Sequence, residues 1–342
     1  MSNPVDPVEN VIEHERPDAL DKNLRPSTWE DYVGQENIKE NLRILLEAAK
    51  LRQQSPEHVL FHGPPGLGKT TLAHLIAREI GGSLKITSGP AIDKVGDLAS
   101  ILTNLNPGDI LFIDEIHRLN KTIEEVLYPA MESRVLDIII GKGPSARTIQ
   151  LDLPEFTLVA ATTRLSLLSA PLRSRFSGGV HRLLYYSNDE LEQVLSRSAR
   201  ILQIKADDSG LREIAKRSRS TPRTANYFLK RARDYAQVHE ATLDQNTVNK
   251  TLDLLEIDEV GLTSTDRRLL ETIINNYGGG PVGVSTLSAA LSEESGTIED
   301  VYEPYLMQIG FIERTPRGRV ATERAYNHLG ISFSDSKQNS FL

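Results

Sequence analysis

The chain has 342 residues, of which 39% are hydrophobic and 25% charged, values typical of a globular protein with room for two or three domains. It contains no cysteine, which excludes disulfides and thiolate metal sites, and its formal charge of −8 argues against nonspecific coating of nucleic acid. We find no signal segment and no run of 18 apolar residues, and we therefore expect a cytoplasmic protein without a membrane partner.

The first 185 residues divide into a tail and an α/β region. Residues 1–20 are acidic, contain three prolines and lack periodicity, which predicts a mobile tail. Residues 21–185 alternate continuous apolar runs with helical apolar spacing, which predicts a parallel sheet with helices on both faces. The predicted strands are 58–62, 109–114 and 156–162, and the predicted helices are 37–50 and 70–80.

The rest of the chain changes character twice. Residues 186–260 repeat apolar residues at three- and four-residue steps only, which predicts a small all-helical domain. Residues 261–330 show three helical patterns followed by two short strands around a turn at GFIERTPRGRVAT (310–322), the plan of a winged helix. We expect the last stretch, residues 331–342, to be loose.

A phosphate-binding loop is predicted between strand 58–62 and helix 70–80. GPPGLGKT (63–70) matches G-x-x-x-x-G-K-[ST] in full. Its glycines let backbone N–H groups curl toward phosphate oxygens, while Lys69 reaches the β- and γ-phosphates and Thr70 places its hydroxyl on Mg²⁺. The alternative is an ordinary Gly/Pro turn, which the surrounding strand and helix disfavour.

Two further strand ends carry polar groups suited to nucleotide hydrolysis. ILFIDEIH (110–117) runs from apolar residues into Asp114 and Glu115, a carboxylate pair that needs a counter-charge such as Mg²⁺. We expect Asp114 to hold the metal through water and Glu115 to act as general base on the attacking water. Strand 156–162 ends at Thr162 and Thr163, and one of the two is expected near the γ-phosphate. An acidic or hydroxyl-rich strand-end turn is the alternative in each case.

A set of motifs in a fixed order gives the chain its resemblance to a known family. The motifs are GPPGLGKTT, TSGPAIDKVGDLASILTNL, LFIDEIHRLN, VLYPAMESR, AATTR, SAPLRSRF, RSRSTPRTAN and RTPRGRVAT. Over about residues 24–330 the chain resembles the RuvB family of AAA+ ATPases, the bacterial Holliday-junction branch-migration motors. The resemblance implies an AAA+ ATPase domain over 21–185, an AAA+ lid over 186–260 and a DNA-binding winged helix over 261–330. The sequence departs from the family's usual motifs at Leu165 and Ser166 after AATTR, at Ser220, and at an extra residue in RFSGGV.

The resemblance also implies roles for individual residues, with ATP and Mg²⁺ as cofactors. Thr163 would be the first sensor, Arg223 the second sensor on the lid, and Arg175 an arginine finger donated to a neighbouring subunit, although Arg173 and Arg175 would also suit surface ion pairs. The catalytic set would be Lys69, Asp114, Glu115, Thr163 and Arg175. The nucleotide contacts would be Leu24, Arg25, Pro26, Tyr32, Val33, Gly63, Gly66, Leu67, Gly68, Lys69, Thr70, Thr71, Tyr186, Pro222 and Arg223.

The same resemblance implies partners. It predicts a homohexameric ring around duplex DNA, a Holliday junction as substrate, RuvA as loading partner and RuvC in the resolving complex. Residues 135–153 read as a hairpin, and its three consecutive isoleucines, Ile138, Ile139 and Ile140, cannot all face one side of a strand. The resemblance assigns these isoleucines to RuvA binding; a hairpin packed on its own core is the alternative.

The arginines of RTPRGR are the candidate DNA contacts. Arg314, Arg317 and Arg319 lie around a predicted exposed turn in a region, 262–330, with six arginines and nine acidic residues. Arginine suits phosphate contacts, and no Asn, Gln or aromatic residue stands beside these three for base readout. A solvated basic turn is the alternative.

Two other functions share parts of this pattern. A protein-remodelling or clamp-loader-like ATPase would keep the nucleotide site without a DNA grip, which the wing and hairpin disfavour. A nucleotide-gated transcriptional switch would bind ATP with incidental turnover, which Glu115 and the candidate arginine finger disfavour. The favoured reading is an ATP-driven DNA motor.

Overall fold

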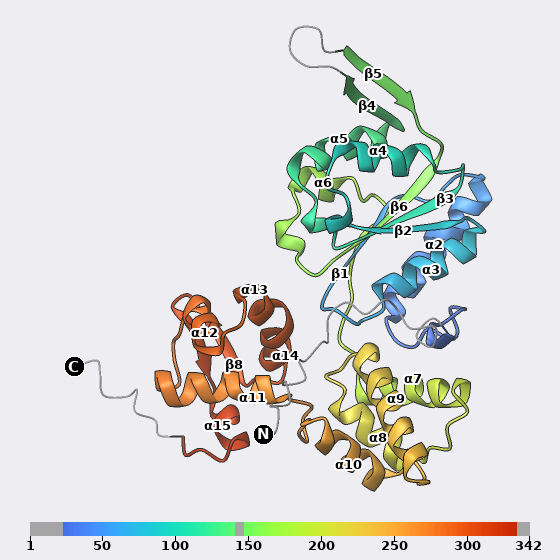
Figure 1. Ribbon diagram of the computed structural model, residues 1–342. Helices are drawn as coiled ribbons and strands as arrows, with labels where there is room; N and C mark the ends of the chain where they lie inside the picture. The colour runs from blue at the N-terminus through green and yellow to red at the C-terminus, as the bar shows by residue number, and fades with distance from the viewer. Residues whose placement is uncertain (1–22, 141–146, 334–342) are drawn as a thin grey trace, which may run out of the picture.

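The computed structural model describes residues 23–140 and 147–333 (Figure 1). The predicted N-terminal tail, nearly all of the predicted C-terminal tail and the turn of the predicted hairpin (141–146) lie outside the described residues. Within the described ranges, no helix has both the length and the apolar character needed to cross a membrane.

A five-stranded parallel sheet forms the centre of the first domain, with strand order β2-β3-β6-β1-β7. The three strands predicted from continuous apolar runs are confirmed, and they form the middle of the sheet. The two edge strands were not predicted, because one presents mostly exposed and half-buried side chains and the other is three residues long. The strands are β1 (Val59–His62), β2 (Leu84–Ser88), β3 (Asp109–Asp114), β6 (Phe156–Thr162) and β7 (Val180–Arg182).

Helices cover both faces of this sheet, as the sequence predicts (Figure 1). Alternate residues of β1 enter different apolar clusters, Phe61 on one face and Leu60 on the other. A strand buried on both faces needs apolar residues at every position, which explains the unbroken apolar runs. One face carries α2 (Glu36–Arg52) and α3 (Lys69–Ile80); the other carries α4 (Val95–Thr103), α5 (Lys121–Glu132) and the short α6 (Ala170–Ser174).

The second domain is a helical lid whose core continues the α2/α3 side of the sheet. Each of its four helices begins after a side chain that accepts a hydrogen bond from a backbone N–H of the first turn, which fixes where the helix starts. These capping residues are Ser187, Asp207, Thr221 and Asp244. The lid helices are α7 (Asn188–Ile201), α8 (Asp208–Arg217), α9 (Pro222–Val238) and α10 (Gln245–Leu254).

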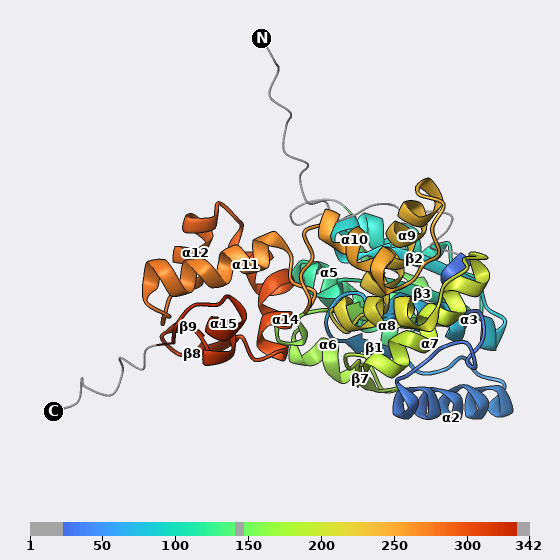
Figure 2. The same ribbon diagram turned by 90° about the horizontal axis from the view of Figure 1, so that it is seen from below.

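The third domain has its own apolar cluster and the predicted winged-helix plan (Figure 2). Its two strands, β8 (Ile312–Thr315) and β9 (Gly318–Ala321), form the antiparallel wing. Two π-helical turns, η5 (Thr272–Asn276) and η6 (Ile298–Tyr302), interrupt the helical segments. The helices are α11 (Ser264–Glu271), α12 (Val284–Leu291), α13 (Ser295–Thr297), α14 (Glu303–Gln308) and α15 (Glu323–His328).

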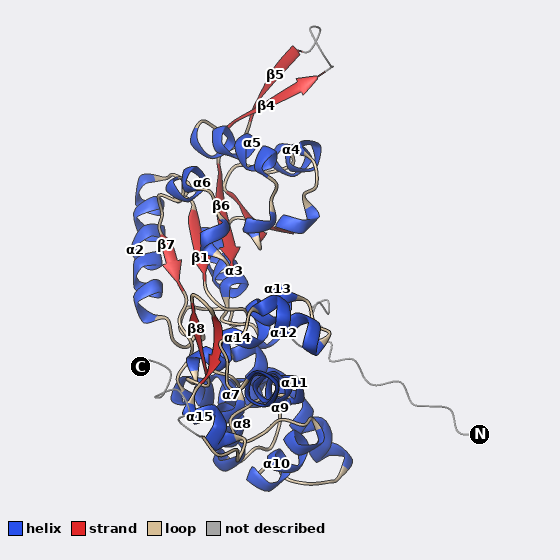
Figure 3. Cartoon of the chain, turned by 90° about the vertical axis from the view of Figure 1, so that its left-hand side faces the viewer, coloured by secondary structure: helices blue, strands red, loops and turns tan. Residues whose placement is uncertain are grey.

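A two-stranded hairpin projects from the sheet domain, at the end opposite the lid and the winged helix (Figure 3). It consists of β4 (Val135–Ile140) and β5 (Arg147–Asp152), with Ile138 opposite Ile149 in register. The predicted hairpin is thus confirmed for its two strands. The side chains of Ile138, Ile139 and Ile140 lie outside the described residues, but that of Ile149 is described and is 44% exposed.

Candidate functional site

The loop between β1 and α3 depends on three glycines with positive φ. Gly63, Gly66 and Gly68 have φ of 143°, 80° and 98°, a range that residues other than glycine rarely adopt. Space is also short, since a Cβ on Gly66 would meet Arg223 Cβ at 3.0 Å and one on Gly68 would meet Tyr32 Oη at 2.8 Å. The loop therefore has the backbone that a phosphate cradle requires, and the residues around it leave no room for side chains at these positions.

Lys69 begins α3 and is buried within this loop, where its ammonium donates to the carbonyl oxygens of Gly63 at 2.7 Å and Pro64 at 2.8 Å. Burial lowers the pKa of Lys69 to about 8, against the opposing pull of Asp114 and Glu115. Thr70 and Thr71 follow in the first turn of the helix and are half-buried. The loop thus holds a buried cation beside two carboxylates, which is the charge arrangement expected of a triphosphate site.

Asp114 and Glu115 stand at the carboxyl end of β3. Burial, with Glu115 as a like-charged neighbour, raises the pKa of Asp114. Burial also works to raise the pKa of Glu115, but hydrogen bonding and charge from His117, with Lys69 and Thr163, hold it below its ordinary value. Glu115 has φ of 46°, a conformation that non-glycine residues rarely adopt. The pKa values of the two adjacent carboxyls are therefore shifted in opposite directions, that of Asp114 upward and that of Glu115 downward.

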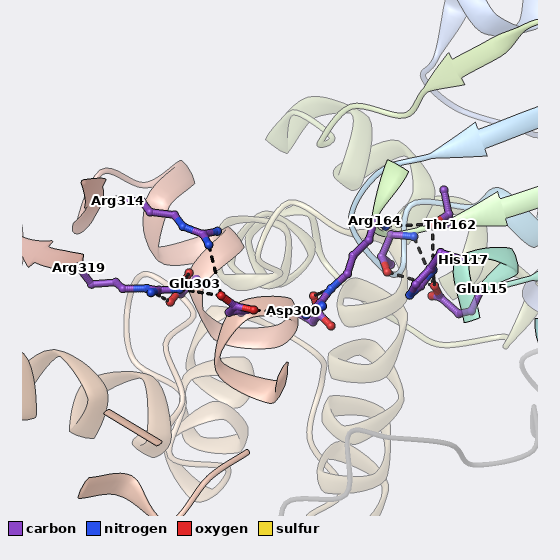
Figure 4. A network of polar contacts seen from close by, with 10 residues as sticks. Glu115, His117, Thr162, Arg164, Asp300, Glu303, Arg314 and Arg319 are labelled. Atoms are coloured by element: carbon purple, nitrogen blue, oxygen red, sulfur yellow. Dashed lines mark hydrogen bonds and ion pairs between the residues drawn. The ribbon is translucent and has the colours of Figure 1, made fainter. Parts of the chain in front are cut away.

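The end of β6 meets Glu115 directly (Figure 4). The Thr163 hydroxyl donates to Glu115 Oε2 at 3.1 Å, and His117 Nδ1 lies 3.1 Å from the same oxygen. Thr162 is fully buried, and its hydroxyl pairs with His117 Nδ1 at 2.9 Å. Of the two threonines left open by the sequence, Thr163 is therefore the one in contact with Glu115. His117 was missed, although it follows Glu115 by two residues in the same motif.

Several of the expected nucleotide contacts gather where the N-terminal segment, the phosphate loop and the lid meet. The hydroxyls of Tyr32 and Tyr186 both point to the carbonyl of Leu67, each at 3.4 Å, and burial raises the pKa of Tyr186 to about 12. Lid residue Arg197 donates to the carbonyl of Leu24 at 2.8 Å. The segment also includes half-buried Arg25, Pro26 and Val33.

The lid reaches the loop through the start of α9. The backbone N–H of Arg223 donates to the carbonyl of Gly66 at 3.4 Å, and its exposed side chain is close enough to lower the pKa of Lys69. Pro222 precedes it as the first residue of α9. The predicted second sensor thus lies beside the phosphate loop.

Arg175 lies elsewhere, at the end of α6. Its guanidinium carbon is 4.3 Å from the Tyr128 ring centroid, and its Nη atoms lie 3.1 Å from Glu132 and 2.7 Å from the carbonyl of Pro171. Its Nε is buried and has no hydrogen-bond partner among the described residues. The contacts of Arg175 are therefore with α5 and α6 and not with the phosphate loop of its own chain.

The wing corrects one expectation from the sequence. The prediction that the three arginines are exposed is wrong for Arg319, which is 6% exposed. Its Nε donates to Glu303 at 2.5 Å and its Nη2 to Glu299 at 2.9 Å, so the charge is neutralised inside the domain (Figure 4). Arg317 is exposed and has no ion-pair partner among the described residues, while Arg314, with a side chain 55% exposed, reaches Glu299 at 3.3 Å.

The sequence of domains along the chain, a phosphate loop in a parallel sheet, then a helical lid, then a winged helix, defines a P-loop ATPase of the AAA class. Models of three families match consecutive parts of it: the Holliday junction DNA helicase RuvB P-loop domain (24–183), the RuvB AAA lid domain (186–258) and the RuvB C-terminal winged helix domain (259–330).

Relatives named RuvB are similar over most of the chain. The branch migration complex subunit RuvB of Chloroflexus aurantiacus is 56% identical over 92% of this chain and 90% of its own length, and that of Dehalococcoides mccartyi is 56% identical over 94% and 92%. The solved structure of the Thermotoga maritima RuvB branch migration motor superposes with a TM-score of 0.84 at 48% identity, covering 91% of this chain and all of that one. The chain therefore belongs to the RuvB family, and it is an ATPase motor of Holliday junction branch migration.

Proposed function

We propose that hydrolysis is carried out by Lys69, Thr70, Asp114, Glu115 and Thr163. Lys69 binds the β- and γ-phosphates, and Thr70 with Asp114 holds Mg²⁺, a hard cation that accepts such oxygen donors. Glu115 activates the attacking water, and Thr163 senses the γ-phosphate. The observation that carries this proposal is the contact of Thr163 and His117 with one oxygen of Glu115, beside a buried lysine. A carboxylate whose pKa is held low is ionised, which is the form that can accept a proton.

We further propose that the base of ATP lies among the residues that meet at Leu67. Tyr32 and Tyr186 close this pocket from two domains. Arg223 senses the phosphates from the lid. The remaining proposed contacts are Leu24, Arg25, Pro26, Val33, Gly63, Gly66, Gly68, Thr71 and Pro222.

For Arg175 we propose a role in trans within a homohexameric ring. Its side-chain contacts are with α5 and α6 and not with the phosphate loop of its own chain, so a nucleotide that it serves would belong to a neighbouring subunit. A guanidinium brought to the γ-phosphate during transfer is worth about 10³–10⁵ in rate.

The test is to mix two inactive variants. Lys69→Ala lacks its own phosphate site and Arg175→Ala lacks the finger, so each alone should lose ATPase activity at least about 100-fold. Mixed rings regain complete sites wherever an intact Lys69 faces an intact Arg175, and activity should return in proportion to such pairs. Mixed rings, verified by pull-down of differently tagged subunits, that show no recovery would place Arg175 outside the neighbour's site.

The proposed substrate is duplex DNA at a Holliday junction, held by wing residues Arg314 and Arg317. We propose boundaries of 21–185, 186–260 and 261–330 for the ATPase, lid and winged-helix domains, and a cytoplasmic location. The test measures ATP hydrolysis and the dissociation of a synthetic four-way junction. ATP hydrolysis should rise when the junction and RuvA are added, and the junction should dissociate faster when RuvA is present. Hydrolysis indifferent to junction and RuvA would favour a protein-remodelling ATPase instead.

We propose RuvA as the partner of the hairpin and RuvC as a further partner in the resolving complex. The supporting observation is that Ile149, opposite Ile138 in register, leaves apolar surface exposed on the hairpin. Ile138→Asp or Ile140→Asp should weaken RuvA binding, measured by calorimetry, while basal ATPase activity stays unchanged. Unaltered RuvA affinity in both variants would remove the hairpin from this interface.

A further inference from the structure

One short segment of the winged helix receives an arginine from each of three parts of the chain. Figure 4 shows two of these arginines, Arg164 and Arg319. From the sheet domain, Arg164 Nε donates to Asp300 Oδ1 at 2.6 Å. From the lid, Arg219 Nη2 donates to the carbonyl oxygen of Val301 at 3.3 Å. From the wing, Arg319 Nη2 donates to Glu299 at 2.9 Å. The three acceptors are consecutive residues of the π-helical turn η6, a geometry that is rare and often found at functional sites.

The first of these arginines is fixed to the hydrolytic site. Arg164 directly follows Thr163, whose hydroxyl contacts Glu115. The Arg164 backbone N–H donates to Thr162 Oγ1 at 3.0 Å, and that oxygen pairs with His117. A shift of the end of β6 therefore moves Arg164 and, through its side chain, pulls on η6 of the winged helix. Arg164 Nη2 also lies 3.7 Å from Glu299, so its charge faces two carboxylates of the same turn.

The second arginine is fixed to the lid hinge. Arg219 and Ser220 both have positive φ, of 51° and 55°, just before α9 and the proposed sensor Arg223. The Arg219 guanidinium lies 3.0 Å from the fully buried Asp266, and its carbon is 4.8 Å from the Tyr305 ring centroid. A lid rotation about this hinge is therefore passed to the winged helix at a residue adjacent to Asp300.

The segment also holds the base of the wing. Glu299 accepts from Arg314 at 3.3 Å as well as from Arg319, and Arg319 is held by Glu303 in the next helix. Arg319 lies on β9, and its backbone pairs with Val282 at 2.9 and 2.8 Å. Movement of residues 299–303 therefore displaces the strand that carries the proposed DNA-contacting turn.

We propose that residues 299–303 form a transmitter that couples the nucleotide state to the position of the wing, with Arg164 and Arg219 as its two positioning inputs. This inference rests on the proposed nucleotide and wing roles. The Arg164–Asp300 pair has side chains 30% and 41% exposed, so it is individually weak and can be broken and remade in a cycle. Arg319 is buried against Glu303, so the output side stays joined while the input side changes.

The deciding variant is Asp300→Asn, which removes the charge facing Arg164 at a winged-helix residue that has no assigned part in nucleotide binding. The readout is the dissociation constant for fluorescein-labelled duplex DNA, measured by anisotropy with ADP and with ATPγS plus Mg²⁺. We expect the ratio of the two constants to move about 3- to 10-fold toward one, while basal ATPase activity without DNA stays within about twofold of wild type. Glu155→Gln is the matched control, since it breaks an Arg134–Glu155 pair of the same 2.6 Å length inside the sheet domain, and it should leave the ratio unchanged.

A charge swap separates coupling from simple loss of a contact. Arg164→Asp alone should also flatten the ratio, and Arg164→Asp with Asp300→Arg should restore it; if Arg164→Asp lowers basal ATPase activity, Asp300→Asn decides alone. If the wild-type ratio differs from one and Asp300→Asn leaves it unchanged, the transmitter is overturned but the proposed function stays intact. A wild-type ratio of one overturns both, because no nucleotide signal then reaches DNA.

Discussion

The phosphate loop and the wing are both short, glycine-containing turns with basic residues, yet they follow different rules. In the loop, backbone conformation sets the geometry, and Lys69 is held by carbonyl oxygens of its own turn. In the wing, the fate of each arginine depends on side chains from other helices, and Arg319 is buried by Glu299 and Glu303 while Arg317 is exposed. A motif that specifies backbone conformation is therefore a stronger predictor than a cluster of like charges.

The largest expected effect tests the backbone half of this comparison. Gly68→Ala places a Cβ 2.8 Å from Tyr32 Oη, and its φ of 98° is strained for alanine, so the loop or the Tyr32 side chain beside it must shift. Misplacing a reacting group by about 1 Å costs about 100-fold in rate, and we expect at least this loss in kcat/KM for ATP hydrolysis.

The matched control is Gly81→Ala at the other end of α3. It has a similar φ of 76° but no atom within 4 Å of the added Cβ. It should lower stability by about 1–2 kcal/mol without changing ATP hydrolysis. Equal losses of activity in the two variants would mean that general strain, and not the shape of the loop, limits the reaction.

The next effect tests the wing. Arg319→Ala leaves the buried carboxylate of Glu303 without its partner, and breaking a buried pair in this way costs about 3–5 kcal/mol. Arg317→Ala should change stability by less than about 0.5 kcal/mol, but it should weaken DNA binding at all sequences and reduce the salt slope by about one. Urea unfolding and anisotropy at two salt concentrations measure both. An Arg319→Ala protein as stable as wild type would show that its burial is not what holds the wing.

The same distinction explains how far the sequence reaches. The central strands and the phosphate loop were predictable because apolar runs and glycine spacing act over a few residues. The partners of Arg319, Thr162 and Arg164 lie 16, 45 and 136 residues away along the chain, so their pairings depend on tertiary structure. Edge strand β2 was not predicted because none of its residues is buried, and its sequence LKITS lacks the apolar run of a central strand.

A smaller effect is expected from the different pKa shifts of buried groups in the two regions. Near the nucleotide site, burial and then Arg25 lower the pKa of His74 to about 4, whereas in the wing Glu303 and Glu299 overcome burial and raise the pKa of Arg319. Below pH 6.5 His74 binds a proton in the unfolded protein but stays neutral in the folded protein. The free energy of unfolding therefore falls as the pH drops from about 6.5 to 4.

His74→Gln should reduce this acid sensitivity. For a half-buried group we expect at most about 1 kcal/mol between pH 6.5 and 5, since solvent screens the interaction. The measurement is the difference in Tm between pH 7 and pH 5 for both proteins. Burial also lowers the pKa of His58, His62 and His181, so part of the acid sensitivity should remain in the variant. An identical pH response in the two proteins would show that His74 does not contribute to the acid sensitivity.

The smallest effect concerns a serine that adopts a glycine-like backbone at the lid hinge. Ser220 has φ of 55°, and its carbonyl accepts from the Tyr186 N–H at 3.0 Å, so this conformation is held by the fold. Holding a residue with a Cβ in the left-handed conformation costs about 1–2 kcal/mol, which a glycine would avoid. About half of this gain is lost again, because glycine raises the conformational entropy of the unfolded chain. Ser220→Gly should therefore stabilise the protein by about 0.5 kcal/mol in urea unfolding. Ser196→Gly, at an exposed position inside α7, should instead destabilise it by about 0.5–1 kcal/mol. Because the same substitution should take opposite signs at the two sites, a loss of stability at Ser220 would show that the serine side chain, and not the backbone angle, stabilises the hinge.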